Sequence, residues 1–74
     1  MEPTKTHLPL LVEMDEDGVY IISCPLWKGC HSYGNTLPEA LANIREVIEL
    51  CMEETPITQL NQFIGWRELE VTCA

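Results

Sequence analysis

Apolar and polar residues alternate in the first part of the chain, and this alternation is typical of a β-strand. A strand places every second side chain on the same face, so the pattern defines one apolar face. Because Pro9 cannot donate a ladder hydrogen bond, the start of this strand should be unpaired or lie at a sheet edge. The residues of the predicted apolar face are Leu8, Leu10, Val12 and Met14.

A turn and a second apolar run follow, and together they predict a β-hairpin. Asp17 and Gly18 form an Asp-Gly pair between the two runs, and Gly tolerates the positive φ that a tight turn requires. Residues 19–24 are rich in β-branched and aromatic side chains, including Tyr20. They predict a second strand that ends before Pro25.

Three further segments have weaker patterns. After a turn at Gly29, residues 30–33 predict a short third strand, which Gly34 ends. Residues 57–65 fit either a short helical turn or an anchored loop. Residues 66–73 alternate again and predict a final, half-buried strand. The residues on one face of that strand are Leu69, Val71 and Cys73.

The clearest element is a helix. Thr36 and Glu39 have the spacing of a capping box, in which each residue satisfies a backbone N–H of the other. Pro38 lies in the first turn, where it loses no helical hydrogen bond, and Pro56 ends the helix near residue 54 or 55. The apolar residues that follow the helical repeat are Leu37, Ala40, Leu41, Ile44, Val47, Ile48, Cys51 and Met52.

The order strand, strand, strand, helix, strand predicts an α+β fold in which one helix packs on a sheet. The chain has 74 residues, and we expect a single domain over residues 1–74 with no separate DNA-binding domain. A domain of this size buries only about 60% of the surface of its unfolded chain. Association with another chain would therefore stabilise it.

Charge limits the classes of partner. The chain has 12 acidic and 4 basic residues, and its formal net charge is −8. Nucleic acids and anionic membranes are bound through clusters of Lys and Arg, so we expect neither a direct nucleic-acid partner nor a membrane partner. A basic protein is the natural complement, because opposite charges steer association.

The cysteines have two interpretations. In a short secreted chain, four cysteines would predict two disulfides. However, the N-terminus carries charges and no apolar signal-peptide core, and no apolar run approaches the length of a membrane span. We therefore interpret the cysteines as reduced thiols of a cytoplasmic protein. They are Cys24, Cys30, Cys51 and Cys73.

A series of short motifs runs through the stretch 13–53, which is more than half of the chain. The motifs are Asp15-Glu16-Asp17-Gly18 with Tyr20, Cys24-Pro25-Leu26, Gly29-Cys30-His31, Gly34-Asn35-Thr36, Glu39-Ala40-Leu41 and Asn43-Ile44. In this order and at these spacings they resemble the HicB-like antitoxin family, also described as the UPF0150-type domain.

This resemblance implies a β-β-β-α-β domain similar to part of the ribonuclease-H fold, with the helix on one face of a mixed sheet whose last strand is parallel to the first. It also implies that the protein binds HicA, a small basic ribonuclease that cleaves mRNA, and blocks the toxin's active site. Homodimers or homotetramers through this domain are a further implication. Most HicB antitoxins carry a C-terminal DNA-binding domain. We expect none here and do not carry over operator binding.

Metal chemistry is one candidate activity. Asp15, Glu16 and Asp17 could hold a divalent cation through their carboxylates. No further spacing resembles a calcium loop, so we interpret them as turn residues. The implied likeness to the ribonuclease-H fold makes two-metal nuclease activity a candidate. Such activity needs carboxylates at close range. The strand positions that face the helix are apolar, which disfavours a nuclease.

Cysteine chemistry is a second candidate. Cys24, Cys30 and His31 could be zinc ligands, but their spacing matches no structural zinc pattern. Cys30 and His31 are neighbours on a strand and should point to opposite faces, which argues against a nucleophile with its base. We interpret the two cysteines as structural residues and the histidine as a surface residue.

Exposed aromatic residues are a third candidate, since such side chains often dominate protein interfaces. Trp27 lies in the loop between Pro25 and Gly29, and both an interface anchor and a core residue fit its position. For Trp66 we expect a core position. The residues that carry the family motif or could contact a partner are Asp15, Asp17, Gly18, Tyr20, Pro25, Trp27, Gly29, Cys30, Gly34, Thr36, Glu39 and Asn43.

We expect no catalytic residue, cofactor or metal. Three functional hypotheses follow. The first is an antitoxin that neutralises a HicA-like basic toxin by covering it. The second is a solitary, homo-oligomeric interaction or regulatory module. The third is a metal-dependent nuclease, which rests on analogy of fold alone.

Overall fold

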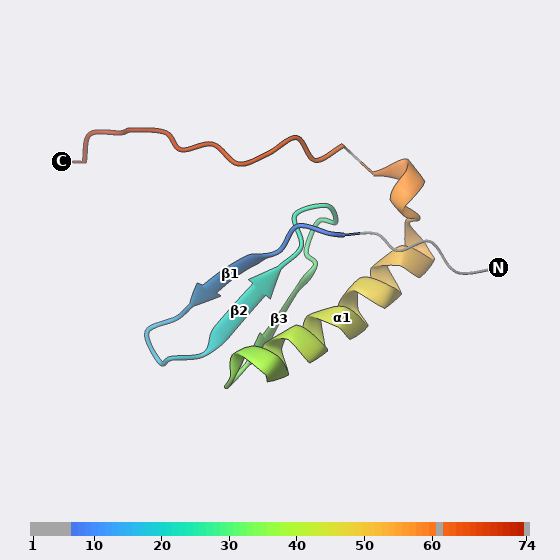
Figure 1. Ribbon diagram of the computed structural model, residues 1–74, viewed down its shortest axis with the longest axis horizontal. Helices are drawn as coiled ribbons and strands as arrows, with labels where there is room; N and C mark the ends of the chain where they lie inside the picture. The colour runs from blue at the N-terminus through green and yellow to red at the C-terminus, as the bar shows by residue number, and fades with distance from the viewer. Residues whose placement is uncertain (1–6, 61, 74) are drawn as a thin grey trace.

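The computed structural model describes residues 7–60 and 62–73, without the side chain of Thr58, and shows a three-stranded sheet followed by one long helix (Figure 1). The strands form an antiparallel meander in the order β1-β2-β3. This arrangement confirms the predicted α+β class. The elements are β1 (Leu11–Met14), β2 (Tyr20–Ser23), β3 (His31–Gly34), α1 (Leu37–Glu54) and the 3₁₀-helix η1 (Ile57–Gln59).

The hairpin between β1 and β2 is stabilised by its own acidic residue. The Asp15 Oδ1 atom accepts hydrogen bonds of 2.9 Å from the backbone N–H groups of both Asp17 and Val19. Gly18 has a φ of +81°, which a residue with a side chain rarely adopts. The predicted Asp-Gly turn is therefore confirmed, and its geometry explains the choice of Asp and Gly at these positions.

The helix begins and ends where the sequence predicts. The Thr36 hydroxyl accepts a 3.2 Å hydrogen bond from the Glu39 backbone N–H, which satisfies one of the free donors of the first turn. At the other end, the Thr55 N–H donates to the Cys51 carbonyl at 2.8 Å, directly before Pro56. For residues 57–65 the sequence left a helical turn and an anchored loop open. The structure has a helical turn, η1, and the described residues after it form no further helix or strand.

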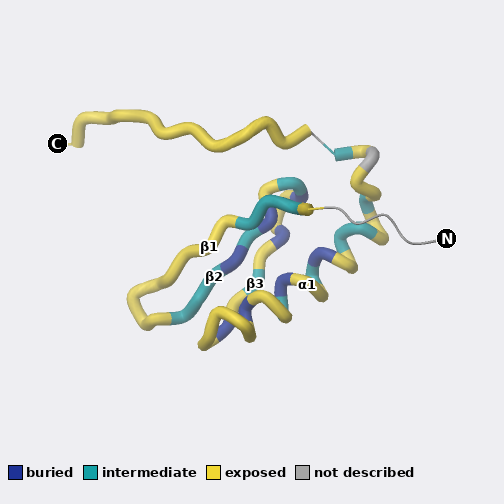
Figure 2. The backbone as a smooth tube through the Cα atoms, viewed as in Figure 1, coloured by how far each residue is buried: buried dark blue, intermediate teal, exposed yellow. Residues whose placement is uncertain are grey.

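The helix packs on β2 and β3, and Figure 2 shows its buried residues along the side that faces them. Ala40 and Ile44 are almost fully buried there, together with Ile22 of β2. Because α1 lies over these two strands, β1 stays uncovered and all four of its residues are exposed. The buried core consists of Ile22, Cys24, Trp27, Cys30, Ala40, Ile44 and Ile48.

The predicted fourth strand does not form within the described residues. Residues 66–73 are exposed and belong to no strand, and the three strands that form pair antiparallel, so the sheet is not mixed. Trp66 is 59% exposed instead of lying in the core. The alternation of residues 66–73 specifies a strand-like segment, but a strand also needs a neighbour to accept its hydrogen bonds. In Figure 1 the segment runs apart from the sheet.

The contact between β3 and α1 generates a stability prediction. A Cβ atom on Gly34 would lie 2.7 Å from the Ala40 Cα, a backbone atom that cannot move aside without shifting the helix. We expect Gly34→Ala to lower the free energy of unfolding by about 2 kcal/mol, as overpacking of a core does. Urea titration followed by circular dichroism measures the change.

The matched control is Gly65→Ala, because a Cβ atom on Gly65 would meet nothing within 4 Å and its φ is not positive. We expect this variant to change the free energy of unfolding by less than about 0.5 kcal/mol. Equal effects of the two substitutions would show that the close approach of β3 and α1 does not constrain residue 34.

Candidate protein-interaction surface

The motif residues at the hairpin end of the sheet mainly build the fold. Asp15, Asp17 and Gly18 form the exposed turn between β1 and β2. Tyr20 is half-buried on β2 and pairs in register with Gly34 of β3. The oxygen of Asp15 that accepts two backbone hydrogen bonds explains why this position carries an acid without any need for a metal ion.

The junction of β3 and α1 lies at the same end of the sheet. Thr36 caps the helix through its hydroxyl, and the Glu39 backbone N–H is the donor. Asn43 Nδ2 donates a 2.8 Å hydrogen bond to the Tyr33 carbonyl, which ties the second turn of α1 to β3. These polar motif residues therefore fix the angle at which the helix leaves the sheet.

The remaining motif residues lie in the loop at the opposite end of the sheet. Pro25 and Gly29 are exposed, and Gly29 has a φ of +76°. Trp27 is only 7% exposed, and its Nε1–H donates a 2.9 Å hydrogen bond to the Thr55 carbonyl. In this chain Trp27 is thus a core residue that ties the loop to the C-terminus of α1. The predicted residues form two separate groups rather than one site.

Three cysteines meet beneath this loop. Burial raises the pKa of the Cys30 thiol to about 12, with further contributions from a hydrogen bond to Cys51 and from the nearby Cys24. Burial also raises the pKa of Cys24. Among the described residues, no group of three or more His, Cys, Asp or Glu side chains is placed to hold a metal ion. His31, next to Cys30, is exposed and stacks edge-on against Tyr33.

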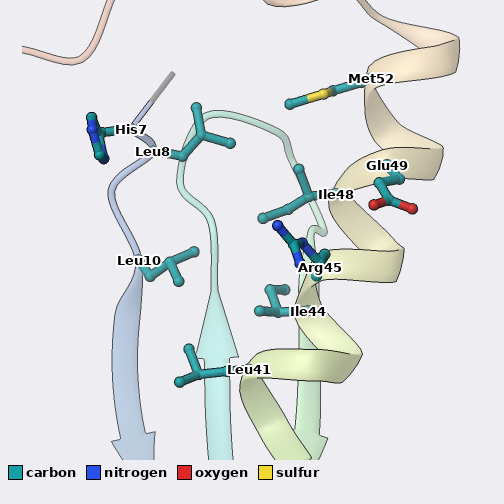
Figure 3. A pocket seen from close by; sticks show the side chains of 9 residues that line it. All are labelled: His7, Leu8, Leu10, Leu41, Ile44, Arg45, Ile48, Glu49 and Met52. Atoms are coloured by element: carbon teal, nitrogen blue, oxygen red, sulfur yellow. The ribbon is translucent and has the colours of Figure 1, made fainter. Parts of the chain in front are cut away.

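An apolar groove lies between α1 and the chain that leads into β1. It has a volume of about 430 Å³. Figure 3 shows Leu41, Ile44 and Ile48 pointing from the helix across the groove toward Leu8 and Leu10. The lining is completed by His7, Arg45, Glu49 and Met52. Sequence reasoning identified both apolar faces but not the groove, because it could not show that the helix would leave β1 uncovered.

The charged surface is dominated by acids. All acidic residues in the described ranges are exposed. On α1, Arg45 is the only basic residue, and the last turn contains no basic residue. The acidic residues of the helix are Glu39, Glu46, Glu49, Glu53 and Glu54. None of the helices in residues 7–60 and 62–73 combines the length and the hydropathy that a membrane span requires.

The fold and this surface define a small α+β domain with an apolar groove and an acidic helix. Its sequence matches the family described as "HicB_like antitoxin of bacterial toxin-antitoxin system" over residues 8–66. The chain therefore belongs to the HicB-like antitoxin family. The family resemblance of the motifs is thereby confirmed.

Relatives of this chain occur in bacteria and archaea. The UPF0150 protein ssr1258 of Synechocystis is 46% identical over 67 residues, which cover 90% of this chain and 97% of that protein. A UPF0150 protein of Archaeoglobus fulgidus is 36% identical over 62 residues, covering 84% and 90%. A UPF0150 protein of Helicobacter pylori is 42% identical over 50 residues, covering 68% of each chain. No solved structure gives a significant match.

The cysteine environments predict different reactivities toward an alkylating agent. Only the thiolate reacts, so the raised pKa and the burial of Cys30 should protect it, whereas Cys73 is exposed. At pH 8, we expect iodoacetamide to modify Cys73 in the native protein and Cys30 only after unfolding. Peptide mass spectrometry of protein quenched at successive times measures both rates, and equal native rates would contradict the prediction.

The raised pKa of the Cys30 thiol also predicts that alkali destabilises the fold. Between the ordinary pKa of 9.0 and the folded value of about 12, the unfolded chain loses the Cys30 proton while the folded chain keeps it. The unfolded state then binds fewer protons, so stability falls as the pH rises through this range. Urea titrations at pH 8 and pH 10.5 should show this loss for the native protein and a smaller loss for Cys30→Ala.

Proposed function

We propose that this chain binds a HicA-type, mRNA-cleaving toxin and neutralises it by covering the toxin's active site. Membership of the HicB-like antitoxin family, over residues 8–66, carries the proposal. An antitoxin of this kind acts by binding and needs no catalytic group of its own. We place the protein in the cytoplasm, where thiols remain reduced, because its four cysteines are free.

The charge of α1 supports a basic partner. The C-terminal end of a helix carries a partial negative charge, which disfavours carboxylates in the last turn. Glu53 and Glu54 lie in that turn and are exposed. Glu49 and Glu53 are also one helical turn apart, where like charges repel. A basic protein surface would offset both the unfavourable interaction with the helix dipole and the repulsion between Glu49 and Glu53. These residues lower the stability of the free chain, and binding a basic partner would give them a function.

A direct test is co-purification with a catalytically silenced HicA-like toxin. We expect a stable complex whose mass, measured by light scattering, gives its stoichiometry. Addition of this chain to the active toxin should abolish cleavage of an mRNA substrate in proportion to the complex formed. A chain that remains separate from the toxin, with undiminished RNA cleavage, would refute the proposal and favour a solitary interaction module.

Charge reversal at the end of α1 tests the contribution of the acidic helix. We expect Glu53→Lys to weaken toxin binding about tenfold, since it replaces an attractive charge with a repulsive one. The same variant should not unfold the protein, because a cation near a helix C-terminus stabilises it by about 0.3–1 kcal/mol. Calorimetric titration at low and high salt separates the electrostatic part of the binding free energy.

The control is Glu16→Lys, which makes the same change of charge in the exposed β1–β2 turn, at the end of the sheet opposite to the C-terminus of α1. We expect it to reduce the affinity by less than threefold, as a distant charge is screened by salt. If both variants bind the toxin as the native protein does, the acidic helix is not part of the interface.

A further inference from the structure

The three clustered cysteines come from three different parts of the chain. Cys24 follows β2, Cys30 precedes β3, and Cys51 lies in the last turn of α1. The backbone N–H of Cys24 donates a 2.9 Å hydrogen bond to the Cys30 carbonyl, so these two residues are neighbours across the strands. Cys51 packs against the buried core that contains both of them. The cluster therefore joins the sheet to the end of the helix.

The three thiols differ in their access to solvent. Cys24 and Cys30 are only 1% and 3% exposed, whereas Cys51 is half-buried. Cys51 also lines a second pocket, which has a volume of about 240 Å³. This pocket is open to solvent, because its lining includes the exposed residues Lys28 and Glu54. A small molecule can thus reach Cys51 first, while the other two thiols lie inside the core.

Cys30 is the thiol that contacts Cys51. The Cys30 thiol forms a hydrogen bond with the Cys51 side chain, so the two sulfur atoms are already neighbours in the folded chain. The Cys24 thiol is instead hydrogen-bonded to the backbone of Leu26. Reversible redox sites commonly have this arrangement, in which an accessible cysteine lies next to a second cysteine that can resolve its oxidised form.

The pocket favours a small, uncharged oxidant. Lys28 and Glu54 contribute one charge of each sign to its lining, and the exposed Glu53 is adjacent in sequence. The C-terminal end of a helix carries a partial negative charge, and the chain has a net charge of −8. An anionic oxidant such as glutathione disulfide would be repelled, whereas hydrogen peroxide is neutral and little larger than water.

We propose that hydrogen peroxide oxidises Cys51 and that Cys30 then forms a disulfide with it, so that Cys51 is a reversible modification site. Thiols of cytosolic proteins are kept reduced, and disulfides formed there are usually transient. The modification is therefore a response to peroxide and not a permanent part of the fold. This inference concerns the cysteine cluster and does not rest on toxin binding.

The reaction has two steps. In the first, the Cys51 sulfur attacks one oxygen of the peroxide, the O–O bond breaks, and water leaves with the thiol proton. The product is a sulfenic acid on Cys51. In the second, the Cys30 sulfur attacks the Cys51 sulfur, the S–O bond breaks, and the hydroxyl group leaves as water with the Cys30 proton. Two thiols are thus oxidised to one disulfide, and one peroxide is reduced to two waters.

The disulfide would join the loop before β3 to the last turn of α1. Trp27 of this loop already donates its indole N–H to the Thr55 carbonyl, so the new bond would reinforce an existing contact. A cross-link stabilises a fold mainly by restricting the unfolded chain. The oxidised protein should therefore unfold at a higher urea concentration than the reduced protein, and dithiothreitol should reverse the change.

Peptide mapping of the native protein tests the pairing directly. Lys28, Arg45 and Arg67 separate the four cysteines, so trypsin places each cysteine in a different peptide. After treatment of the folded protein with equimolar hydrogen peroxide, we expect mass spectrometry to show peptide 29–45 linked to peptide 46–67. Peptide 6–28, which contains Cys24, should remain free, and dithiothreitol should separate the linked pair.

Two variants test the order of the steps, with dimedone as a trap for sulfenic acid. In Cys30→Ala, the sulfenic acid on Cys51 has no resolving thiol, and dimedone should label peptide 46–67. In Cys51→Ser, we expect oxidation of Cys30 to be at least about tenfold slower, because its thiol is buried and protonated. Cys24→Ala is the matched control and should still form the link between Cys30 and Cys51. Circular dichroism shows whether each variant is folded.

Three results would overturn the proposal. The first is a native protein in which peroxide leaves peptides 29–45 and 46–67 unlinked. The second is a link from either of these peptides to peptide 6–28 in their place, which would make Cys24 the partner. The third is dimedone labelling of Cys30 in folded Cys51→Ser at the rate seen for Cys51 in Cys30→Ala, because Cys51 would then have no special access to the oxidant.

Discussion

The close packing of α1 on β2 and β3 is the constraint on which the rest of the structure depends. Gly34 has no side chain, so the first turn of the helix can approach the end of β3 closely at Ala40. From this contact the helix runs across the sheet, and Ile44 meets the core around Ile22. The cap at Thr36 and the hydrogen bond from Asn43 to the Tyr33 carbonyl help to fix the angle between α1 and the sheet.

This constraint also determines what remains open. A single helix of 18 residues covers two strands and leaves the third without cover. The uncovered strand and the groove beside it are therefore both consequences of the way in which α1 packs on β2 and β3. In a chain this small, the apolar surface left outside the core is large relative to the core itself, which favours association.

The family motif and the exposed acidic and apolar surfaces are largely different sets of residues. The motif residues form turns, caps and close contacts, and several of them, including Trp27, Cys30 and Gly34, are buried. The acidic side of α1 and the apolar edge of β1 are built from residues outside the motif, apart from Glu39. Glu49 belongs both to the acidic side of α1 and to the lining of the groove, so the two surfaces meet along the helix.

Sequence alone determined the elements whose stability depends on near neighbours. The Asp-Gly turn, the cap at Thr36 and the end of the helix before Pro56 were all predicted, because each depends on hydrogen bonds within a few residues. The apolar faces of the first strand and of the helix were predicted for the same reason, as each follows from a local periodicity. Family membership also followed from motifs that encode these local features.

Only the tertiary structure decided where those elements meet. Trp27 could be an anchor or a core residue until the C-terminus of α1 was placed beside it, within reach of its indole N–H. The alternation of residues 66–73 correctly indicated extended chain, but not whether a neighbouring strand would be present. Local pattern fixes the conformation of a segment, whereas burial and pairing depend on surfaces that are distant in sequence. For this reason the sequence predicted the turn, the caps and the helix, whereas the groove and the open edge of β1 became visible only in the tertiary structure.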